Sequence, residues 1–390
     1  FSLHGIPVLL KDNINFEGLA TTAGSIALNN NISQNAFVVD KLINEGALIL
    51  GKTNLSEWAY YFCNNCPSGY SAKGGQTLNP YARKKFDSGG SSSGSGAAIS
   101  ANFSSVSLGS ETSGSILSPS SANSIVGLKP TIGLVSRSGI VPISSTLDTS
   151  GPMTKNVIDN AIVLKAISGY DPDDSKSVNK SNIDLESIIN SNLKGKRFGV
   201  FKDYLSDSLY LNAINKIKKS GGTIIEFSPP KVDFSDFRKI LDFDMKFDLP
   251  KYFKKNNILF NSINDIVEFN SKDSLLRSPY GQGIFKSIVS DSTKLDEINS
   301  IKTRIKTEGK KYFDIAIKKY KLDAIISINN YHAGYAAGAY YPCLTVPMGY
   351  DEVGKPFNLT FISPSFTENK LLQIGYAFEK ETNFRVKPFN

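Results

Sequence analysis

The sequence predicts an α/β layered fold, and three observations support this fold class. Short apolar segments with the length of buried strands recur along the chain, first at residues 6–10 and 47–50. A segment with helical spacing of apolar side chains separates these two, at residues 36–43. Strand-like segments return near the C-terminus. Such alternation is typical of a sheet covered by helices.

A capping pattern follows the second predicted strand. Asn54, with Glu57 three residues later, resembles the pair of side chains that cap the first turn of a helix. We therefore expect a helix that opens at Asn54 and includes Trp58 and Ala59.

Residues 88–139 are rich in serine and glycine, a composition that often marks a flexible linker. Here the small residues are interleaved with apolar segments at residues 97–99, 106–108 and 125–128, which we expect to be short buried strands. Small residues between core strands permit close backbone approach, so we interpret this region as a site and not as a tether.

A helix is predicted for residues 157–167, ending near Gly169, and the polar residues 171–191 are expected to form a surface connection. Residues 196–308 are rich in lysine, asparagine and phenylalanine and have weak patterning. We interpret this region as an irregular cap or insertion that shapes the substrate pocket of a single domain spanning residues 1–390.

The C-terminal part returns to regular patterns. Strands are predicted at residues 324–328, 344–346 and 359–362, and a helix near residues 371–378. The sheet is expected to close there, and we find no internal repeats.

The composition is that of an ordinary globular protein, with 40% hydrophobic and 21% charged residues. The net charge of +8 is spread along the chain without a motif that reads RNA or DNA, so we expect no nucleic-acid partner. No apolar run reaches the roughly 18–20 residues that span a bilayer. Because the chain begins at Phe1 and not at Met, we expect that a leader or an N-terminal segment has been removed, so both a cytoplasmic and an exported location stay open.

Three cysteines are too few for a disulfide framework. Cys63 and Cys66 form a lone C-x-x-C pair, for which we expect a local disulfide or two plain thiols. A structural zinc ion usually takes four Cys or His ligands, and the histidines here are only His4 and His332, so no metal site is predicted.

Three segments carry residues that can do chemistry: GIPVLLKDN at residues 5–13, GGSSSGSG at 89–96 and GSETSGSI at 109–116. Lys11 ends an apolar strand, where it either reaches solvent or, if buried, has a lowered pKa and can act as a base. Ser115 lies in a turn of small residues, whose backbone N–H groups can converge as an oxyanion hole.

The serine-rich segment allows an alternative. Gly90, Ser92 and Gly94 formally match the G-x-S-x-G elbow of Ser-His-Asp hydrolases, with His332 downstream. The chain order permits this triad, so the residues alone leave it open. A phosphate-binding loop is disfavoured, since no Lys-Ser or Lys-Thr follows at the required spacing.

Taken together, the three segments closely resemble the amidase-signature family, in which a lysine in a GIPV-x-x-KD strand, the first serine of a GGSS loop and a serine 24 residues later form a triad. The resemblance covers nearly the whole chain and implies an α/β/α fold with a large mixed sheet flanked by helices. It assigns Lys11 as the base, Ser91 as a bridging serine after a cis peptide and Ser115 as the nucleophile, with Ser92 in support. The implied oxyanion hole comprises the N–H groups of Thr112, Ser113, Gly114 and Ser115, and no cofactor or metal is implied.

Three departures from the commoner family pattern, Glu111, Ser113 and Leu117, resemble the peptide-amidase branch. This resemblance implies hydrolysis of a peptide C-terminal amide or a small primary amide, with release of ammonia. Two alternatives stay open: the glutaminase (A) subunit of a glutamyl-tRNA amidotransferase, and a non-catalytic amidase-like binding scaffold. The sequence leaves the oligomeric state open.

Overall fold

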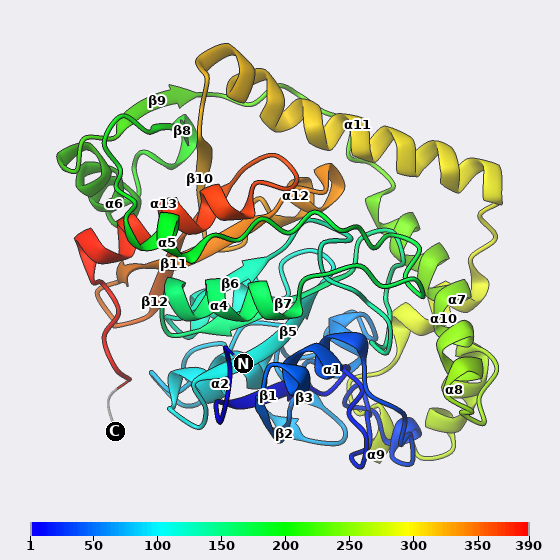
Figure 1. Cartoon of the computed structure of the whole chain (residues 1–390). Helices are drawn as coiled ribbons and strands as arrows, with labels where there is room; N and C mark the ends of the chain where they lie inside the picture. Colours follow the sequence, from blue (N-terminus) through cyan, green and yellow to red (C-terminus); the bar gives the residue numbers. More distant parts are fainter. Residues whose placement is uncertain (1, 389–390) are drawn as a thin grey trace.

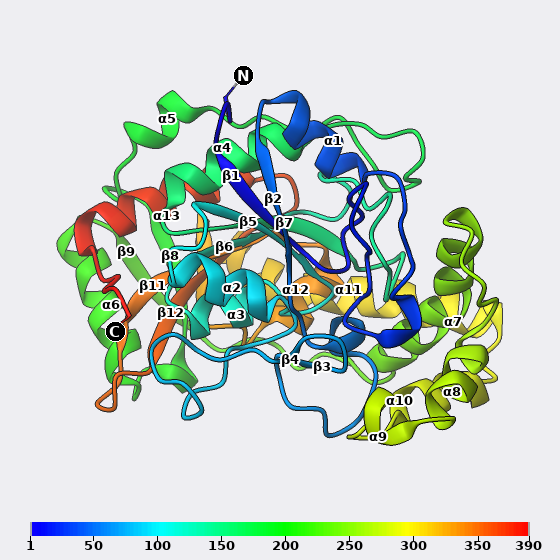
Figure 2. The ribbon, with the colours of Figure 1, turned by 90° about the horizontal axis from the view of Figure 1, so that it is seen from below.

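The fold of the computed structural model, which describes residues 2–388, is built on one ten-stranded mixed sheet (Figures 1 and 2). The strand order is β2-β1-β5-β7-β6-β11-β12-β10-β8-β9. The strands are β1 (Pro7–Lys11), β2 (Leu48–Thr53), β5 (Val106–Glu111), β6 (Val126–Lys129), β7 (Thr149–Thr154), β8 (Arg197–Phe201), β9 (Thr223–Phe227), β10 (Ala324–Ile328), β11 (Cys343–Tyr350) and β12 (Pro356–Ile362). A separate two-stranded sheet pairs β3 (Tyr70–Ser71) with β4 (Gly75–Gln76).

Helices cover both faces of the sheet, as the two perpendicular views show (Figures 1 and 2). One layer consists of α1 (Phe37–Asn44), α4 (Val157–Ile167), α5 (Leu185–Ile189), α6 (Ser208–Lys219) and α13 (Glu368–Thr382). The other consists of α2 (Ser93–Ser100), α3 (Leu117–Ala122), α11 (Leu295–Tyr320) and α12 (Ala333–Ala339). The predicted layered α/β fold with a large mixed sheet is therefore confirmed.

The parallel strands β2, β1 and β5 bring the chemical segments together. Val8 of β1 lies opposite Ile49 on one side and Val106 on the other. Because parallel neighbours end at the same edge of a sheet, the ends of β1 and β5 place Lys11 and residues 110–111 close together. The main core lies on these strands: Val8, Leu10 and Leu108 have no exposed surface.

A helical lobe stands at one end of the sheet and has its own core (Figure 1, right). Buried side chains of this core include Met245, Phe253 and Phe285, and Trp58 and Phe62 from the N-terminal part of the chain pack against Phe285. The helices of the lobe are α7 (Phe237–Lys255), α8 (Ile263–Ser271), α9 (Ser274–Arg277) and α10 (Gly283–Ser290).

The expectation of an irregular region at residues 196–308 is wrong. Its first part adds β8, α6 and β9 to the sheet, and its second part is mostly helical. Helix starts were present in the sequence: Asp207 caps α6, and Ser262 with Asp265 forms the capping box of α8. The pattern of α7 was weak because its apolar and charged residues are spread around the helix, with Pro250 inside it.

Two shorter predictions also need correction. Residues 97–99 belong to α2 and not to a strand, since they continue a helix that begins in the serine-rich loop. No α-helix opens at Asn54: its side chain donates to Gly75 O and Thr77 Oγ1 and accepts from Ser71, while Ser56 precedes a short 3-10 turn, η2 (Glu57–Tyr60).

The polar segment 171–191 is less exposed than predicted, because Asp171 and Asp174 are buried and hydrogen-bonded. The other predicted strands and helices are found where the sequence placed them, at β1, β2, β5, β6, β10, β11, β12, α1, α4 and α13. Within residues 2–388, no helix combines the length and apolar character needed to cross a membrane.

Candidate active site

Lys11, at the end of β1, is completely buried and has three polar partners. Its Nζ lies 2.7 Å from Ser91 Oγ, 2.9 Å from Ser110 Oγ and 3.0 Å from the carbonyl oxygen of Ser110. The amino group is therefore hydrogen-bonded in either protonation state. As an ammonium it donates to all three oxygens; as a neutral amine it donates to Ser110 and accepts from the Ser91 hydroxyl.

Burial lowers the pKa of Lys11 to about 7, although the nearby carboxylates of Asp148 and Glu111 act to raise it. Removing an ammonium from water disfavours the charged form, which explains the direction of the change. A substantial fraction of Lys11 is thus neutral near pH 7, as a general base requires.

Ser91 begins the turn that leads into α2 and is also completely buried. The peptide bond between Gly90 and Ser91 is cis, and the Ser91 carbonyl oxygen accepts from the Ser56 N–H at 3.0 Å. Gly109 of β5 permits the close approach of this turn, because a Cβ there would lie 2.9 Å from Ser92 Oγ.

Ser115 follows β5 in a tight turn that the Glu111 carboxylate organises. Glu111 Oε2 accepts from the N–H groups of Ile116 at 2.6 Å and Leu117 at 3.0 Å, while Gly114 adopts a φ of 105° that favours glycine. The Ser92 N–H donates to the Ser115 carbonyl oxygen at 3.1 Å, which joins this turn to the Ser91 segment.

Backbone donors are exposed in the same turn. The N–H groups of Ser113, Gly114 and Ser115 have no acceptor among the residues that the structure describes. All three residues line a cavity of about 520 Å³. A substrate carbonyl oxygen in this cavity can thus meet several unpaired donors beside the Ser115 hydroxyl.

The cavity around Ser115 is lined by residues from two parts of the chain, 60–122 and 329–357. The region 196–308, which we expected to shape the substrate pocket, contributes no residue to this lining. Its helix α7 instead lines a second cavity.

The structure does not join Ser92 and His332 as an elbow triad would require. Ser92 Oγ donates to the Ser110 carbonyl oxygen at 3.1 Å and accepts from the Ser110 N–H at 3.3 Å. His332 is buried, stacks on Phe201 with ring centroids 3.9 Å apart, and bonds through Nδ1 to Ser327 Oγ at 2.5 Å. Burial also lowers the pKa of His332 to about 4. Both side chains therefore serve packing and support.

Asp148 holds the first residue of the predicted oxyanion turn. Its Oδ1 accepts from the Thr112 hydroxyl at 2.6 Å, and its Oδ2 accepts from the N–H groups of Ile143 and Ser144, each at 2.8 Å. Burial raises the pKa of Asp148 to about 6 even though these hydrogen bonds stabilise the carboxylate. Asp148 thereby fixes the start of the turn.

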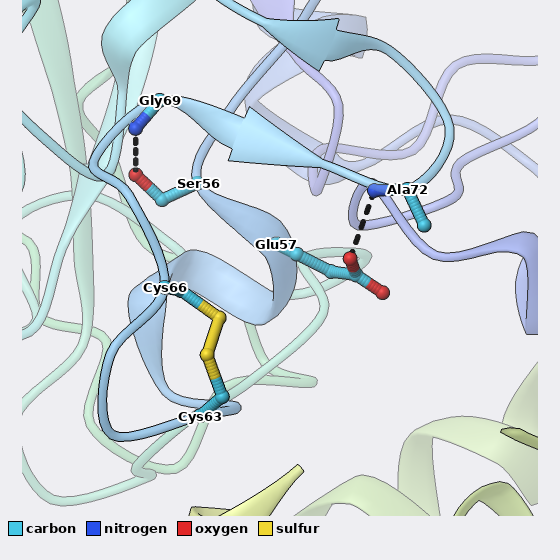
Figure 3. Close-up of a disulfide and its surroundings, with 6 residues drawn as sticks. All are labelled: Ser56, Glu57, Cys63, Cys66, Gly69 and Ala72. Carbon is cyan, nitrogen blue, oxygen red and sulfur yellow. Dashed lines mark hydrogen bonds between the residues drawn. A yellow bond between two sulfur atoms is a disulfide. The ribbon is translucent and has the colours of Figure 1, made fainter. Parts of the chain in front are cut away.

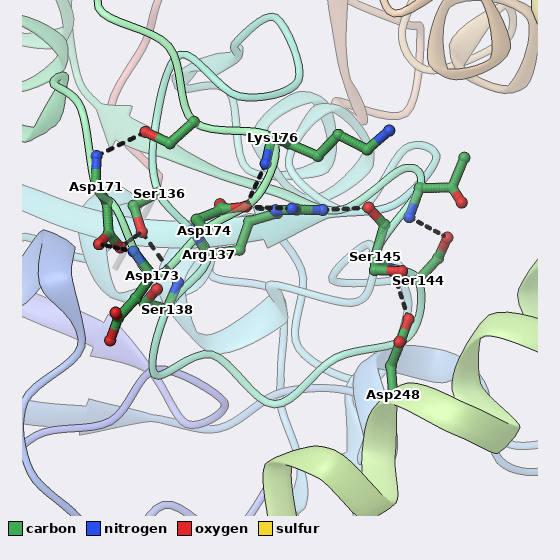
Figure 4. Close-up of polar contacts among 12 residues, drawn as sticks. Ser136, Arg137, Ser138, Ser144, Ser145, Asp171, Asp173, Asp174, Lys176 and Asp248 are labelled. Atoms are coloured by element: carbon green, nitrogen blue, oxygen red, sulfur yellow. Dashed lines mark hydrogen bonds and ion pairs between the residues drawn. The ribbon is translucent and has the colours of Figure 1, made fainter. Parts of the chain in front are cut away.

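The second cavity, of about 240 Å³, lies on the other side of this turn and is lined by Thr112, Ser110 and Asn13. Figure 4 shows its charged wall, where the Arg137 guanidinium pairs with Asp174 and donates to the Ser145 carbonyl oxygen. Asp248 of α7 accepts from the Ser145 N–H at 2.8 Å, so the wall is closed by mutual hydrogen bonds (Figure 4).

The segment between Tyr60 and Ser68 forms part of the rim of the Ser115 cavity. A disulfide joins Cys63 to Cys66 within it, which settles the two alternatives for this pair in favour of the bond (Figure 3). Ser56 Oγ accepts from the Gly69 N–H at 2.8 Å and secures the far end of the segment (Figure 3). Among the described residues, no group of three or more His, Cys, Asp or Glu side chains is placed to hold a metal ion.

Sequence reasoning missed several residues of the site. Ser110 was not singled out, although it lies one residue after the glycine that opens the GSETSGSI segment. Asp148 was noted only as part of a matching block, and Asn330 carried no sequence signal. The structure adds them because it brings β5, β7 and the turn after β10 to one edge of the sheet.

Comparison with known proteins places this geometry in context. A family model described as Amidase matches residues 2–328. A probable amidase of Arabidopsis thaliana is 37% identical over 99% of this chain and 78% of its own length.

Solved structures extend the comparison. The peptide amidase of Stenotrophomonas maltophilia has a TM-score of 0.92 at 36% identity, covering 99% of this chain and 84% of that one. The glutaminase component of the glutamyl-tRNA(Gln) amidotransferase of Thermotoga maritima, its A-type polypeptide, has a TM-score of 0.74 at 26% identity, covering 99% and 86%. The chain is thus more similar in structure to the peptide amidase.

Proposed function

The chain belongs to the amidase-signature family and is an amide-hydrolysing enzyme, and from this premise we propose that it removes the C-terminal amide of peptides by a Ser115–Ser91–Lys11 mechanism. One observation carries the proposal: a fully buried lysine whose Nζ lies 2.7 Å from the hydroxyl of Ser91. A buried lysine needs a function or an ion partner to offset its desolvation, and Lys11 has no ion pair among the described residues.

The first half of the reaction forms an acyl-enzyme. Neutral Lys11 accepts the proton of Ser91 while Ser91 accepts the proton of Ser115, and Ser115 Oγ attacks the amide carbon. The N–H groups of the turn at residues 112–115 bind the negative oxygen of the tetrahedral intermediate. As the C–N bond breaks, the relay returns the proton to the nitrogen, and ammonia leaves.

The second half restores the enzyme. Water gives one proton to the relay and attacks the Ser115 ester, and the ester bond breaks as the proton returns to Ser115 Oγ. The product is the peptide with a free C-terminal carboxylate. No step needs a histidine, which fits the packing of His332 against Phe201, its hydrogen bond to Ser327 and its lowered pKa.

The choice of a peptide amide is supported by the position after the nucleophile. Leu117 is buried in an apolar cluster with Phe313 and Ala333, so this position offers no cation to a substrate carboxylate. The greater structural similarity to the peptide amidase supports the same choice.

The test is ammonia release from a panel of peptide amides, simple primary amides and glutamine. We expect peptide amides to be the best substrates, Ser115→Ala to abolish release, and Lys11→Met and Ser91→Ala to reduce kcat by at least about 1,000-fold. His332→Ala is the matched control and is expected to keep its activity, since His332 only packs against Phe201.

Other outcomes are equally informative. Preference for glutamine would favour the glutaminase component of an amidotransferase, to which the chain is also similar. Loss of activity in His332→Ala with a folded protein, together with an active Ser115→Ala, would overturn the mechanism. A wild type that is silent on every amide would favour the binding-scaffold alternative.

A further inference from the structure

Asn330, in the turn between β10 and α12, lies directly against the nucleophile turn. It lines the Ser115 cavity, and a Cβ placed on Gly114 would be 3.1 Å from Asn330 Nδ2 and 3.6 Å from Asn330 Cβ. Gly114 immediately precedes Ser115. The side-chain amide of Asn330 therefore faces the same space as the unpaired backbone donors.

The Asn330 side chain has spare hydrogen-bonding capacity. It is half-buried, and neither of its amide atoms bonds to another residue of the part of the chain that the structure describes. A half-buried amide without a protein partner is available for a ligand, because an amide carries two donors and an acceptor.

The turn that carries Asn330 is held rigidly. The neighbouring Asn329, with a φ of 47°, exchanges two hydrogen bonds with Asn358 of β12: its N–H donates to Asn358 O, and its Oδ1 accepts from Asn358 N–H, each at 2.9 Å. The Asn329 carbonyl oxygen also accepts from the Thr360 hydroxyl. A donor presented on such an anchored turn is pre-organised, so little energy is lost in orienting it during the reaction.

We propose that Asn330 is a further catalytic residue, whose Nδ2 donates a hydrogen bond to the substrate oxygen as the tetrahedral intermediate forms, supplementing the backbone oxyanion hole. The inference rests on the proposed nucleophile, Ser115. It assigns a side-chain donor from the C-terminal part of the chain to a hole otherwise built from the segment after β5.

Kinetics of Asn330→Leu and Asn330→Ala test the role. An oxyanion donor acts mainly in the transition state, so we expect kcat on a peptide amide to fall about 100-fold while KM stays within about twofold. Asn330→Asp keeps the size but removes the donor and adds a negative charge beside the oxyanion, so it should be at least as slow. Asn212→Ala, at an exposed position of α6, is the matched control.

A peptide aldehyde separates the inference from the proposed function. The aldehyde forms a tetrahedral adduct with a nucleophilic serine, and calorimetry measures its affinity without turnover. Aldehyde binding weakened about 100-fold in Asn330→Leu, with the fold intact by circular dichroism, would support the donor role.

The opposing results are distinct. Aldehyde affinity equal in wild type and Asn330 variants, or a higher KM at unchanged kcat, would refute the role of Asn330. A wild type that binds the aldehyde but cleaves no peptide amide would refute the peptide-amidase proposal and leave the role of Asn330 to be decided by the aldehyde data.

Discussion

The pH dependence of the reaction is the most direct consequence of the buried lysine. The base must be neutral to act, and burial sets the pKa of Lys11 at about 7. At pH 7 about half of the enzyme then holds a neutral amine, whereas a lysine at the reference value of 10.4 would be neutral in only about one molecule in 2,500. The enclosure of Lys11 thus increases the active fraction about 1,000-fold at neutral pH.

The expected profile follows from the sign of this change. Since the deprotonated form is active, kcat/KM should rise with pH, have its midpoint near 7 and level off above about 8. Well below the midpoint it should fall about tenfold for each pH unit, and more steeply below about 6 if protonation of Asp148 also loosens Thr112. His332, with a pKa of about 4, cannot produce a limb near 7.

The assay is ammonia release from a peptide amide between pH 5 and 9.5 at constant ionic strength, with circular dichroism at each pH to verify the fold. The quantity fitted is kcat/KM, because it reports ionisation of the free enzyme. A flat profile, or a midpoint above 9, would refute the assignment of Lys11 as a base whose pKa is lowered by burial.

Three further predictions follow from named contacts. Glu111→Gln keeps an acceptor for the N–H groups after Ser115 but removes an anion that raises the pKa of Lys11, so the midpoint of kcat/KM should move to lower pH; an unchanged or higher midpoint would contradict this. His332→Ala should leave the midpoint in place but lower the free energy of unfolding by about 2–3 kcal/mol in urea titrations, because a buried, stacked ring is lost; undiminished stability would show that the packing contributes little. Asp174→Ala should lower the free energy of unfolding by about 3–5 kcal/mol, since it leaves the Arg137 guanidinium largely buried without its carboxylate, and a loss below 1 kcal/mol would refute that reasoning.

Local signals in the sequence were sufficient for the first half of the sheet. The apolar segments before Lys11 and around Leu108 have the length and composition of buried strands, and both are strands. Residues 97–99 were misassigned because a short apolar run has no period that separates a strand from a helix turn. The helical lobe was missed because α7 carries aromatic and charged residues around its whole circumference.

The candidate site was predictable to the extent that its residues lie in linear motifs. Lys11, Ser91 and Ser115 were nominated from such motifs, and the direct contact of Lys11 with Ser91 agrees with that nomination. The triad as a catalytic unit stays a prediction until the variants are measured. Asn330 was not predictable, because it reaches the site only through strand order: the first residue of β10 lies 209 residues after Ser115 in the sequence, and no local pattern encodes that approach.

The strand order has a consequence for how the protein is made. The strands β11 and β12 occupy the middle of the sheet, between β6 and β10, although they are the last strands to leave the ribosome. Until residues 343–362 emerge, the half-sheet ending at β6 and the group of β10, β8 and β9 each present an unpaired edge during translation. Exposed edges of this kind recruit other strands, so the nascent chain passes through a stage prone to aggregation. Chaperone binding should therefore concentrate on chains shorter than about 343 residues, before β11 and β12 join the two halves of the sheet.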